Sequence, residues 1–240
     1  MSTTYYGTLD SIPVNLSVQP GQAFPTDRQG TLVETDTLPP GASVDNIFYF
    51  DSPTTGLFLQ RVFDGPVRAA HCGVYADGTD QTSKLQTALN HPAINEIVFD
   101  YFETSPVVIN GALTVPANKQ LTFNKGNYLT TTSSGTISGA GLYDATEYGR
   151  AFDGNLVVSG IHPARNVATP FHFGAAGNNA TDDTPAIQRL FNYLYSLRII
   201  DTPPTIVFPA AVYFTPAAID LPLGGFGTRF IEILGYGATL

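Results

Sequence analysis

The stretch FGAAGNNATDDTPAIQRLF, residues 173–191, decides the fold. Gly174 permits a sharp turn at the end of a strand, because glycine adopts backbone angles that other residues avoid. Residue types that cap helices follow at Asp182, Asp183 and Thr184. Apolar side chains then recur at helical spacing, at Ile187, Leu190, Phe191, Leu194 and Leu197. The stretch therefore predicts a turn and then an amphipathic helix over about residues 184–198.

A looser copy of this stretch, HCGVYADGTDQTSKLQ, occupies residues 71–86. The matching residues, in order, are His71 and His172, Gly73 and Gly174, Asp80 and Asp182, Thr82 and Thr184, and Gln86 and Gln188. We therefore expect Gly73 and Asp80 to have the same turn and capping roles as their counterparts. A period near 100 residues indicates a duplicated unit, because the repeat of a solenoid turn is far shorter.

Short β-rich runs follow each predicted helix. In the first copy they cover 97–100, 107–109, 112–115, 120–123 and 127–130, and in the second 205–208, 211–214, 217–221 and 229–234. The corners between these runs lack the dipeptides that form tight β-hairpins, with the exception of Asn110-Gly111. Such strands favour a parallel β-helix over an antiparallel meander. Residues 131–170, rich in Ser, Thr and Gly, are interpreted as a linker with one apolar run at 156–161.

The N-terminal part has a different pattern. Residues 1–45 carry turn signals without strong periodicity, which argues against a compact helical domain. Two aromatic-rich runs then predict a β-hairpin over residues 47–63. Its phenylalanines are the predicted oligomer or anchor interface: Phe48, Phe50, Phe58 and Phe63. We thus divide the chain into residues 1–69, a first module at 70–165 and a second at 166–240.

Composition excludes several classes of function. The 240 residues carry a net charge of −9, and the 11 Lys and Arg are scattered, so neither a nucleic-acid binder nor a binder of anionic membranes is expected. No apolar run reaches the ~18 residues of a membrane span. Cys72 is the single cysteine, which rules out an intramolecular disulfide and argues against a zinc site. Because the N-terminus lacks the features of a signal peptide, we expect folding in a reducing cytosol.

Structural roles explain the residues that could carry chemistry. Asp182 and Asp183 directly precede a predicted helix, so we interpret them as capping residues rather than an acid–base pair. We interpret Cys72 as an apolar filler, and His71 and His172 as histidines that hydrogen-bond locally. The acids available for glycoside cleavage are Asp100 with Glu103, Asp144 with Glu147, and Asp220 with Glu232. None of these pairs is spaced to stack on successive turns, so no catalytic residue, metal ligand or cofactor is predicted.

Two groups of motifs resemble known proteins. The stretch at 173–191, with TIVFPAAVYF at 205–214 and IEILGYGATL at 231–240, resembles the start of the pectate-lyase-like right-handed β-helix superfamily. The passage GLFLQRVFDGPVRAAHCGVYADGTDQT, residues 56–82, resembles the approach to the β-helix in bacteriophage tailspikes and tail fibres. Gln81 stands where that pattern has an Asp, and Asn178-Asn179 where it has Asp-Gly. These departures affect turn and cap chemistry but leave the expected fold intact.

The resemblance implies a fold and a function. The fold is mainly β: short right-handed parallel β-helix modules, each opened by a capping α-helix, after an irregular or β-rich N-terminal anchor. The function is that of a structural virion protein, the N-terminal part of a longer tailspike or tail fibre that attaches the fibre to the tail and supports receptor recognition. It would assemble in the host cytoplasm as a homotrimer, dock to other tail proteins through its N-terminal region, and act in the virion tail, with a host-surface glycan as a further candidate partner.

Two alternatives stay open. One is a polysaccharide lyase or glycosidase of the pectate-lyase-like class, with its active site in this chain or in a further C-terminal part. The other is a bacterial carbohydrate-binding or surface β-helix protein, against which the N-terminal sequence counts.

Overall fold

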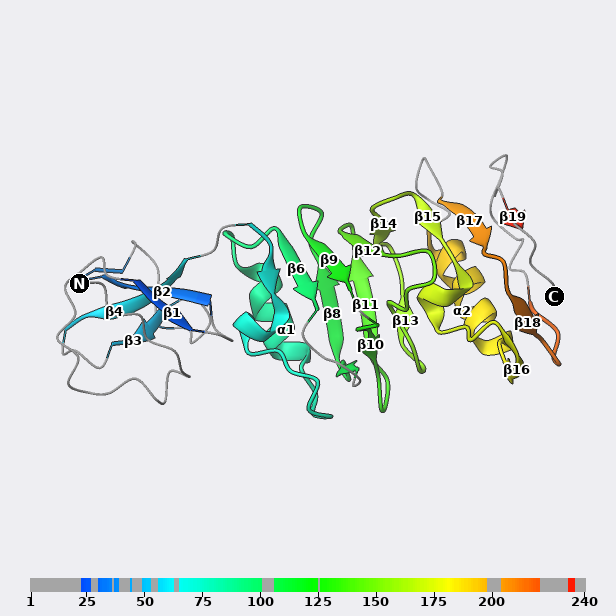
Figure 1. The fold of residues 1–240 in the computed structure, drawn as a ribbon, viewed down its shortest axis with the longest axis horizontal. Helices are drawn as coiled ribbons and strands as arrows, with labels where there is room; N and C mark the ends of the chain where they lie inside the picture. Colours follow the sequence, from blue (N-terminus) through cyan, green and yellow to red (C-terminus); the bar gives the residue numbers. More distant parts are fainter. Residues whose placement is uncertain are drawn as a thin grey trace. The chain divides into compact units, whose positions relative to one another are not determined.

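The computed structural model describes residues 23–26, 30–35, 37–38, 44, 49–52, 56–62, 65–100, 106–124, 126–197, 204–220 and 233–235 (Figure 1). The chain forms two compact units, residues 1–74 and 75–240. The fold is mainly β, with several short parallel sheets and two α-helices among the described residues. The expectation of a mainly β chain with two helices is therefore confirmed.

The first unit contains an antiparallel sheet in the order β1-β2-β4-β3. Its strands are β1 (Ala23–Thr26), β2 (Gly30–Thr35), β3 (Tyr49–Asp51) and β4 (Phe58–Val62). Within the predicted hairpin, β3 and β4 pair antiparallel with Phe50 opposite Leu59. Phe50 is buried beneath the guanidinium of Arg61, which lies 4.8 Å from its ring centroid, whereas Phe58 is half-buried. Phe48 and Phe63 lie outside the described residues.

The second unit opens with helix α1 (Thr82–Asn90), after which the chain runs through three parallel sheets. The first sheet holds β6 (Glu96–Phe99), β9 (Gln120–Phe123), β12 (Leu142–Ala145) and β14 (His162–Pro163). The second pairs β7 (Val107–Val108) with β10 (Leu129–Thr130), and Phe152 bridges to β10. The third joins β8 (Ala112–Val115), β11 (Thr136–Gly139) and β13 (Val157–Val158).

The chain visits these three sheets in the same order in each of three turns. Residues that pair in neighbouring turns lie 20 to 24 positions apart, from Leu142 opposite His162 to Glu96 opposite Gln120. Because side chains alternate along a strand, equivalent residues of successive turns point inward together. Inward columns result, such as Ile97, Leu121 and Tyr143, which are all fully buried. Residues 131–170, predicted to be a linker, instead carry strands of the first and third sheets and the bridge from Phe152 to the second, so that interpretation was wrong.

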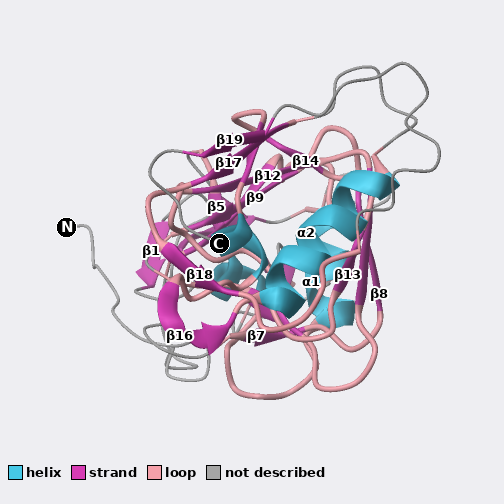
Figure 2. Ribbon diagram, turned by 90° about the vertical axis from the view of Figure 1, so that its right-hand side faces the viewer, coloured by secondary structure: helices cyan, strands magenta, loops and turns pink. Residues whose placement is uncertain are grey.

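A second helix interrupts this stacking. The chain passes through β15 (Val167–Ala168), the 3₁₀ turn η3 (Pro170–Phe173) and β16 (Asn178–Asp182) into α2 (Thr184–Ser196). Strands β17 (Thr205–Phe208), β18 (Val212–Phe214) and β19 (Ile233–Gly235) follow, and they pair parallel in the orders β15-β17-β19 and β16-β18. Figure 2 shows both helices beside β8 and β13; α1 packs against β8, and α2 packs against η3 and β13.

The apolar face of α2 is the one that the sequence indicates. Ile187, Leu190, Leu194 and Leu197 are all buried, together with Tyr193, whereas Phe191, also predicted for this face, is half-buried. The helix begins at the predicted residue and ends two residues before the predicted end. In the second copy, the predicted strand at 217–221 is absent over its described residues 217–220. Prolines at 216 and 222 flank that segment, and proline restricts strand pairing.

Glycine fixes the corner between the third and the first sheet. Gly139 has a φ of +129°, and the side of its α-carbon where a β-carbon would stand packs directly against the carbonyl group of Val115 in the preceding turn. Gly160, with a φ of +74°, lies in the same way on the carbonyl of Gly139. A β-carbon at either position would collide with main-chain atoms of the turn before. The parallel stack therefore requires glycine at this corner in the second and third turns, whereas Val115 occupies it in the first.

We expect Gly139→Ala to lower the free energy of unfolding by about 2–4 kcal/mol, because backbone strain and overpacking act together. Gly78→Ala is the matched control, since Gly78 also has a positive φ, of +81°, but no atom lies within 4 Å of an added β-carbon. Denaturant unfolding of the full chain should give a loss of only about 1–2 kcal/mol for the control. Equal losses for both variants would contradict the close stacking of turns.

Candidate functional site

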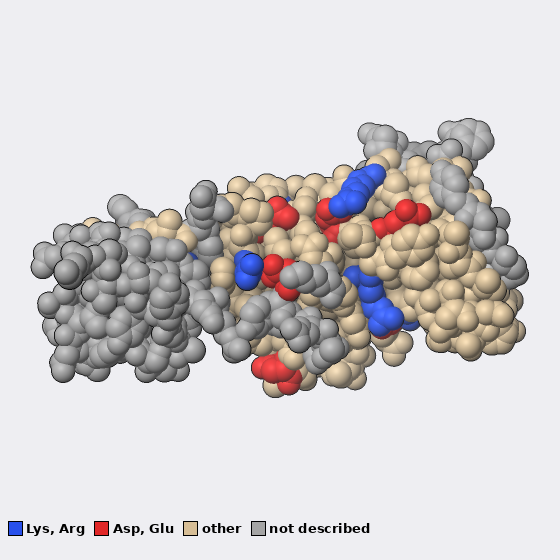
Figure 3. All heavy atoms as spheres, in the orientation of Figure 1, with Lys and Arg blue, Asp and Glu red and all other residues tan. Residues whose placement is uncertain are grey.

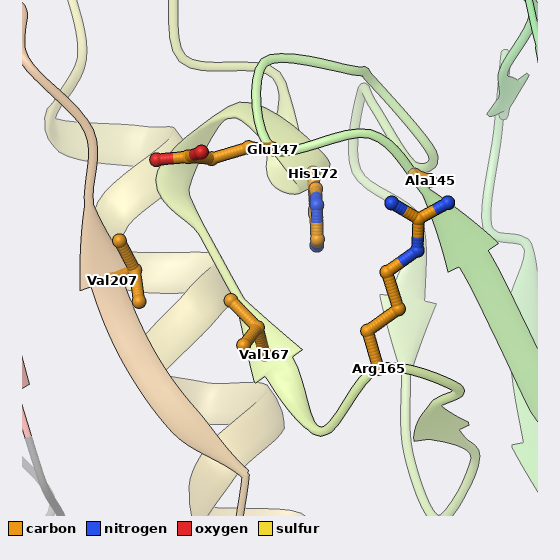
Figure 4. Close-up of a pocket in the computed structure, with 6 residues that line it drawn as sticks. All are labelled: Ala145, Glu147, Arg165, Val167, His172 and Val207. Carbon is orange, nitrogen blue, oxygen red and sulfur yellow. The ribbon is translucent and has the colours of Figure 1, made fainter.

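A pocket of about 240 Å³ lies where the three-turn stack meets the second helix-opened module. Its lining residues come from β12, β15, η3, β17 and the connecting turns: Ala145, Glu147, Arg165, Val167, His172 and Val207. Figure 4 shows the carboxylate of Glu147 and the guanidinium of Arg165 on opposite sides, with the imidazole of His172 between them. The pocket thus combines an apolar wall of alanine and valine with three polar groups.

An ion pair fixes one side of the pocket. The Arg165 guanidinium contacts both carboxylate oxygens of Asp144, with Nε–Oδ1 at 2.8 Å and Nη2–Oδ2 at 3.2 Å. Asp144 lies on β12, one turn before Arg165 in the stack. Figure 3 shows acidic and basic side chains close together on this face, over the region of β12, β14 and β15. Arg165 therefore brings little net charge to the pocket.

His172 is held at the centre as a neutral imidazole. Its Nε2 lies 3.1 Å from the carbonyl oxygen of Thr146, so Nε2 must donate, and Nδ1 accepts from the Tyr143 hydroxyl at 3.3 Å. Burial lowers the pKa of His172 to about 4, against the raising effect of its hydrogen bond to Thr146. The ring is uncharged at neutral pH, and both nitrogens are engaged within the chain.

Two of the residues predicted to cap the helices, Asp182 and Asp80, each bind the first amide of the helix that follows. Asp182 Oδ1 accepts a hydrogen bond from the Thr184 amide at 2.9 Å, and Asp80 accepts from the Thr82 amide at 3.0 Å. Burial raises the pKa of Asp80, but its hydrogen bonds from Thr82 and Asn110 outweigh this and lower it. Gly73 and Gly174 both adopt left-handed conformations, with φ of +70° and +92°, directly after a 3₁₀ turn.

Asp183 has a further role that the capping interpretation missed. Its buried carboxylate accepts from the amides of Ala176 at 2.6 Å, Gly177 at 3.2 Å and Phe214 at 3.3 Å. It makes no side-chain capping bond to α2. In the first copy Gln81 takes this place, and its Oε1 accepts from the Tyr75 amide at 3.3 Å. Gln81, which stands where the second copy has Asp183, thus still anchors the loop before the helix but carries no charge.

A glutamine clamp is the residue role that sequence reasoning missed altogether. Gln86 Oε1 accepts from the Thr114 amide at 2.7 Å, and its Nε2 donates to the Thr114 carbonyl at 3.0 Å. Gln188 binds both main-chain groups of Asp220 in the same way, at 2.7 and 2.9 Å. The sequence did carry a signal for this role, because Gln86 and Gln188 occupy matching positions in the two copies of the repeat. The duplication therefore extends to side-chain hydrogen bonds.

Of the acids considered for glycoside cleavage, Asp144 and Glu147 lie at or beside the same pocket, whereas Asp100 is half-buried directly after β6. Asp144 is paired with Arg165, Glu147 lines the pocket, and Asp220 is exposed. Glu103 and Glu232 lie outside the described residues. Over the described parts of the chain, no three His, Cys, Asp or Glu side chains gather as metal ligands, and no helix is long and apolar enough to cross a membrane. Cys72 is a buried free thiol.

Comparison of the chain with family models, with curated proteins and with solved structures found no match.

The lowered pKa of His172 predicts a loss of stability in acid. The unfolded chain binds this proton near pH 6.5 and the folded chain near pH 4, so the unfolded state holds more protons between these values. Stability should therefore fall by up to about 3 kcal/mol as the pH drops through this window.

His172→Gln should flatten that part of the pH dependence, measured as denaturant unfolding at a series of pH values. His91→Gln, outside the pocket, is the comparison variant and should keep the wild-type slope. An unchanged slope in the His172 variant would contradict burial of a neutral imidazole.

Proposed function

We propose that the chain is the N-terminal part of a bacteriophage tailspike or tail fibre, a structural virion protein that attaches the fibre to the tail and supports receptor recognition. One observation carries the proposal. The same helix-opened unit occurs twice, and between the copies the chain runs in a constant order through three parallel sheets. This order supports a parallel β-helix of the pectate-lyase-like kind. We propose that this helix is right-handed, because nearly all connections between parallel strands of one sheet are right-handed.

The pocket chemistry favours this structural role over the alternative of a polysaccharide lyase or glycosidase. Glycoside hydrolysis commonly uses two carboxyl groups about 5–9 Å apart. Glu147 is the one carboxylate among the described lining residues, and the nearby Asp144 is held by both guanidinium contacts to Arg165. Both oxygens of Asp144 are thus engaged within the chain, which leaves Glu147 without a second free carboxylate beside it among the described residues of the pocket.

The two units would have different roles in the fibre. The first unit would dock to other tail proteins and hold the subunits of a homotrimer together, and Phe58 on β4 offers partly accessible aromatic surface for this. The second unit would give the fibre a rigid stem and lead toward the receptor-binding part, where a host-surface glycan is the candidate target. Assembly would take place in the host cytoplasm, and the working location would be the tail of the virion.

Light scattering after size-exclusion chromatography of the 240-residue chain tests the assembly. A homotrimer should have a mass of about 77 kDa, three times the 25.6 kDa of one chain. Phe58→Ser should shift the mass toward the monomer if the first unit holds the subunits together. Phe214→Ser is the matched control, because Phe214 is 43% exposed but lies on β18 of the second unit. A monomer for the unaltered chain would contradict the proposed assembly.

A further inference from the structure

We propose that the pocket between Glu147 and Arg165 binds the ammonium group of an aliphatic amine, with the carbon chain of the ligand against Val167 and Val207. This inference goes beyond the proposed structural function and does not depend on it. It rests on the charge distribution around the pocket, on a carboxylate without a partner, and on the apolar wall.

The charged groups at the pocket leave one negative charge unbalanced, because Arg165 is paired with Asp144 and Glu147 has no cation of its own among the described residues. Asp144 and Arg165 form an ion pair, yet at the His172 imidazole the carboxylate has the larger effect: Asp144 raises the pKa of His172 more than Arg165 lowers it. The imidazole itself is neutral and offers no positive charge. A cation therefore enters this pocket more favourably than an anion, and the net charge of −9 on the chain acts in the same direction.

Glu147 supplies the specific partner. Its side chain is exposed beside the pocket, and among the described residues nothing donates a hydrogen bond to its carboxylate or forms an ion pair with it. Its main-chain carbonyl is fixed by the Thr169 hydroxyl at 2.9 Å, which anchors the residue at the rim. Figure 4 shows the carboxylate on the Val207 side of the pocket, across from Arg165. An ammonium group there would gain a charge-assisted hydrogen bond without competing for Asp144.

The apolar wall of the pocket favours a ligand whose ammonium group is attached to a hydrocarbon chain. Val207 is 7% exposed, and Ala145, Val167 and Val207 leave a surface suited to methylene groups. A volume of about 240 Å³ accommodates a chain of a few carbons. Two sources carry this chemistry, a free alkylamine and the side chain of a lysine on a partner protein.

Isothermal titration calorimetry of the full chain tests the proposal with four small probes: n-butylamine, Nα-acetyl-lysine amide, 1-pentanol and valerate. We expect the two cations to bind and the neutral and anionic probes to bind at least about tenfold more weakly. Tighter binding of the lysine derivative indicates a protein partner, and equal or tighter binding of butylamine indicates a free amine; either supports the site.

The variant Glu147→Gln should weaken binding of the cations about tenfold. Asp220→Asn is the matched control, since it removes another exposed carboxylate outside the pocket lining and should leave binding unchanged. Because the Glu147 carboxylate has no described partner, its variant should fold, and circular dichroism checks this. Absence of amine binding, equal binding of pentanol or valerate, or unchanged affinity in Glu147→Gln would each overturn the proposal.

Discussion

Main-chain hydrogen bonds between successive parallel turns are the interaction on which the rest of this structure depends. The amide of Gln120 donates to Asn95, that of Leu142 to Lys119, and that of His162 to Gly141, so each turn is held by the one before. Buried main-chain groups must find partners, and for the strands of the stack these partners lie in the neighbouring turn. The turns must therefore keep nearly constant length and direction, and this requirement explains the inward columns and the glycine corner.

A stack of this kind has open ends, and the helices cover them. Each helix is joined to the chain that follows it by one glutamine that binds both main-chain groups of a single residue, Thr114 on β8 or Asp220 after β18. The end of α1 is held further by the buried Lys119, whose ammonium group donates to the carbonyls of His91 and Ile94. Where α2 is inserted, paired residues of neighbouring strands lie further apart in the sequence than in the three-turn stack, as Val167 and Thr205 do. The pocket lies at this interruption.

The sequence was most informative where one periodicity dominated. The apolar positions of α2 and the match between the two copies placed the helices and their turns. Residues 131–170 were misjudged because their strands are two to four residues long and their glycines and threonines serve the corners. The pattern also could not separate Asp182, which binds the first helical amide, from Asp183, which anchors the loop. The pocket could not be predicted, since its residues are spread from 145 to 207 and meet only through the stacking of turns.

The parallel stack itself is tested most directly by amide hydrogen exchange of the full chain, followed residue by residue. The account predicts slow exchange for the amides that bind the preceding turn, at Gln120, Leu142 and His162 in the first sheet and at Thr136 and Val157 in the third, so that protection recurs every 20 to 24 residues. Protection confined to the helices, or protected pairs grouped around short local hairpins, would contradict it.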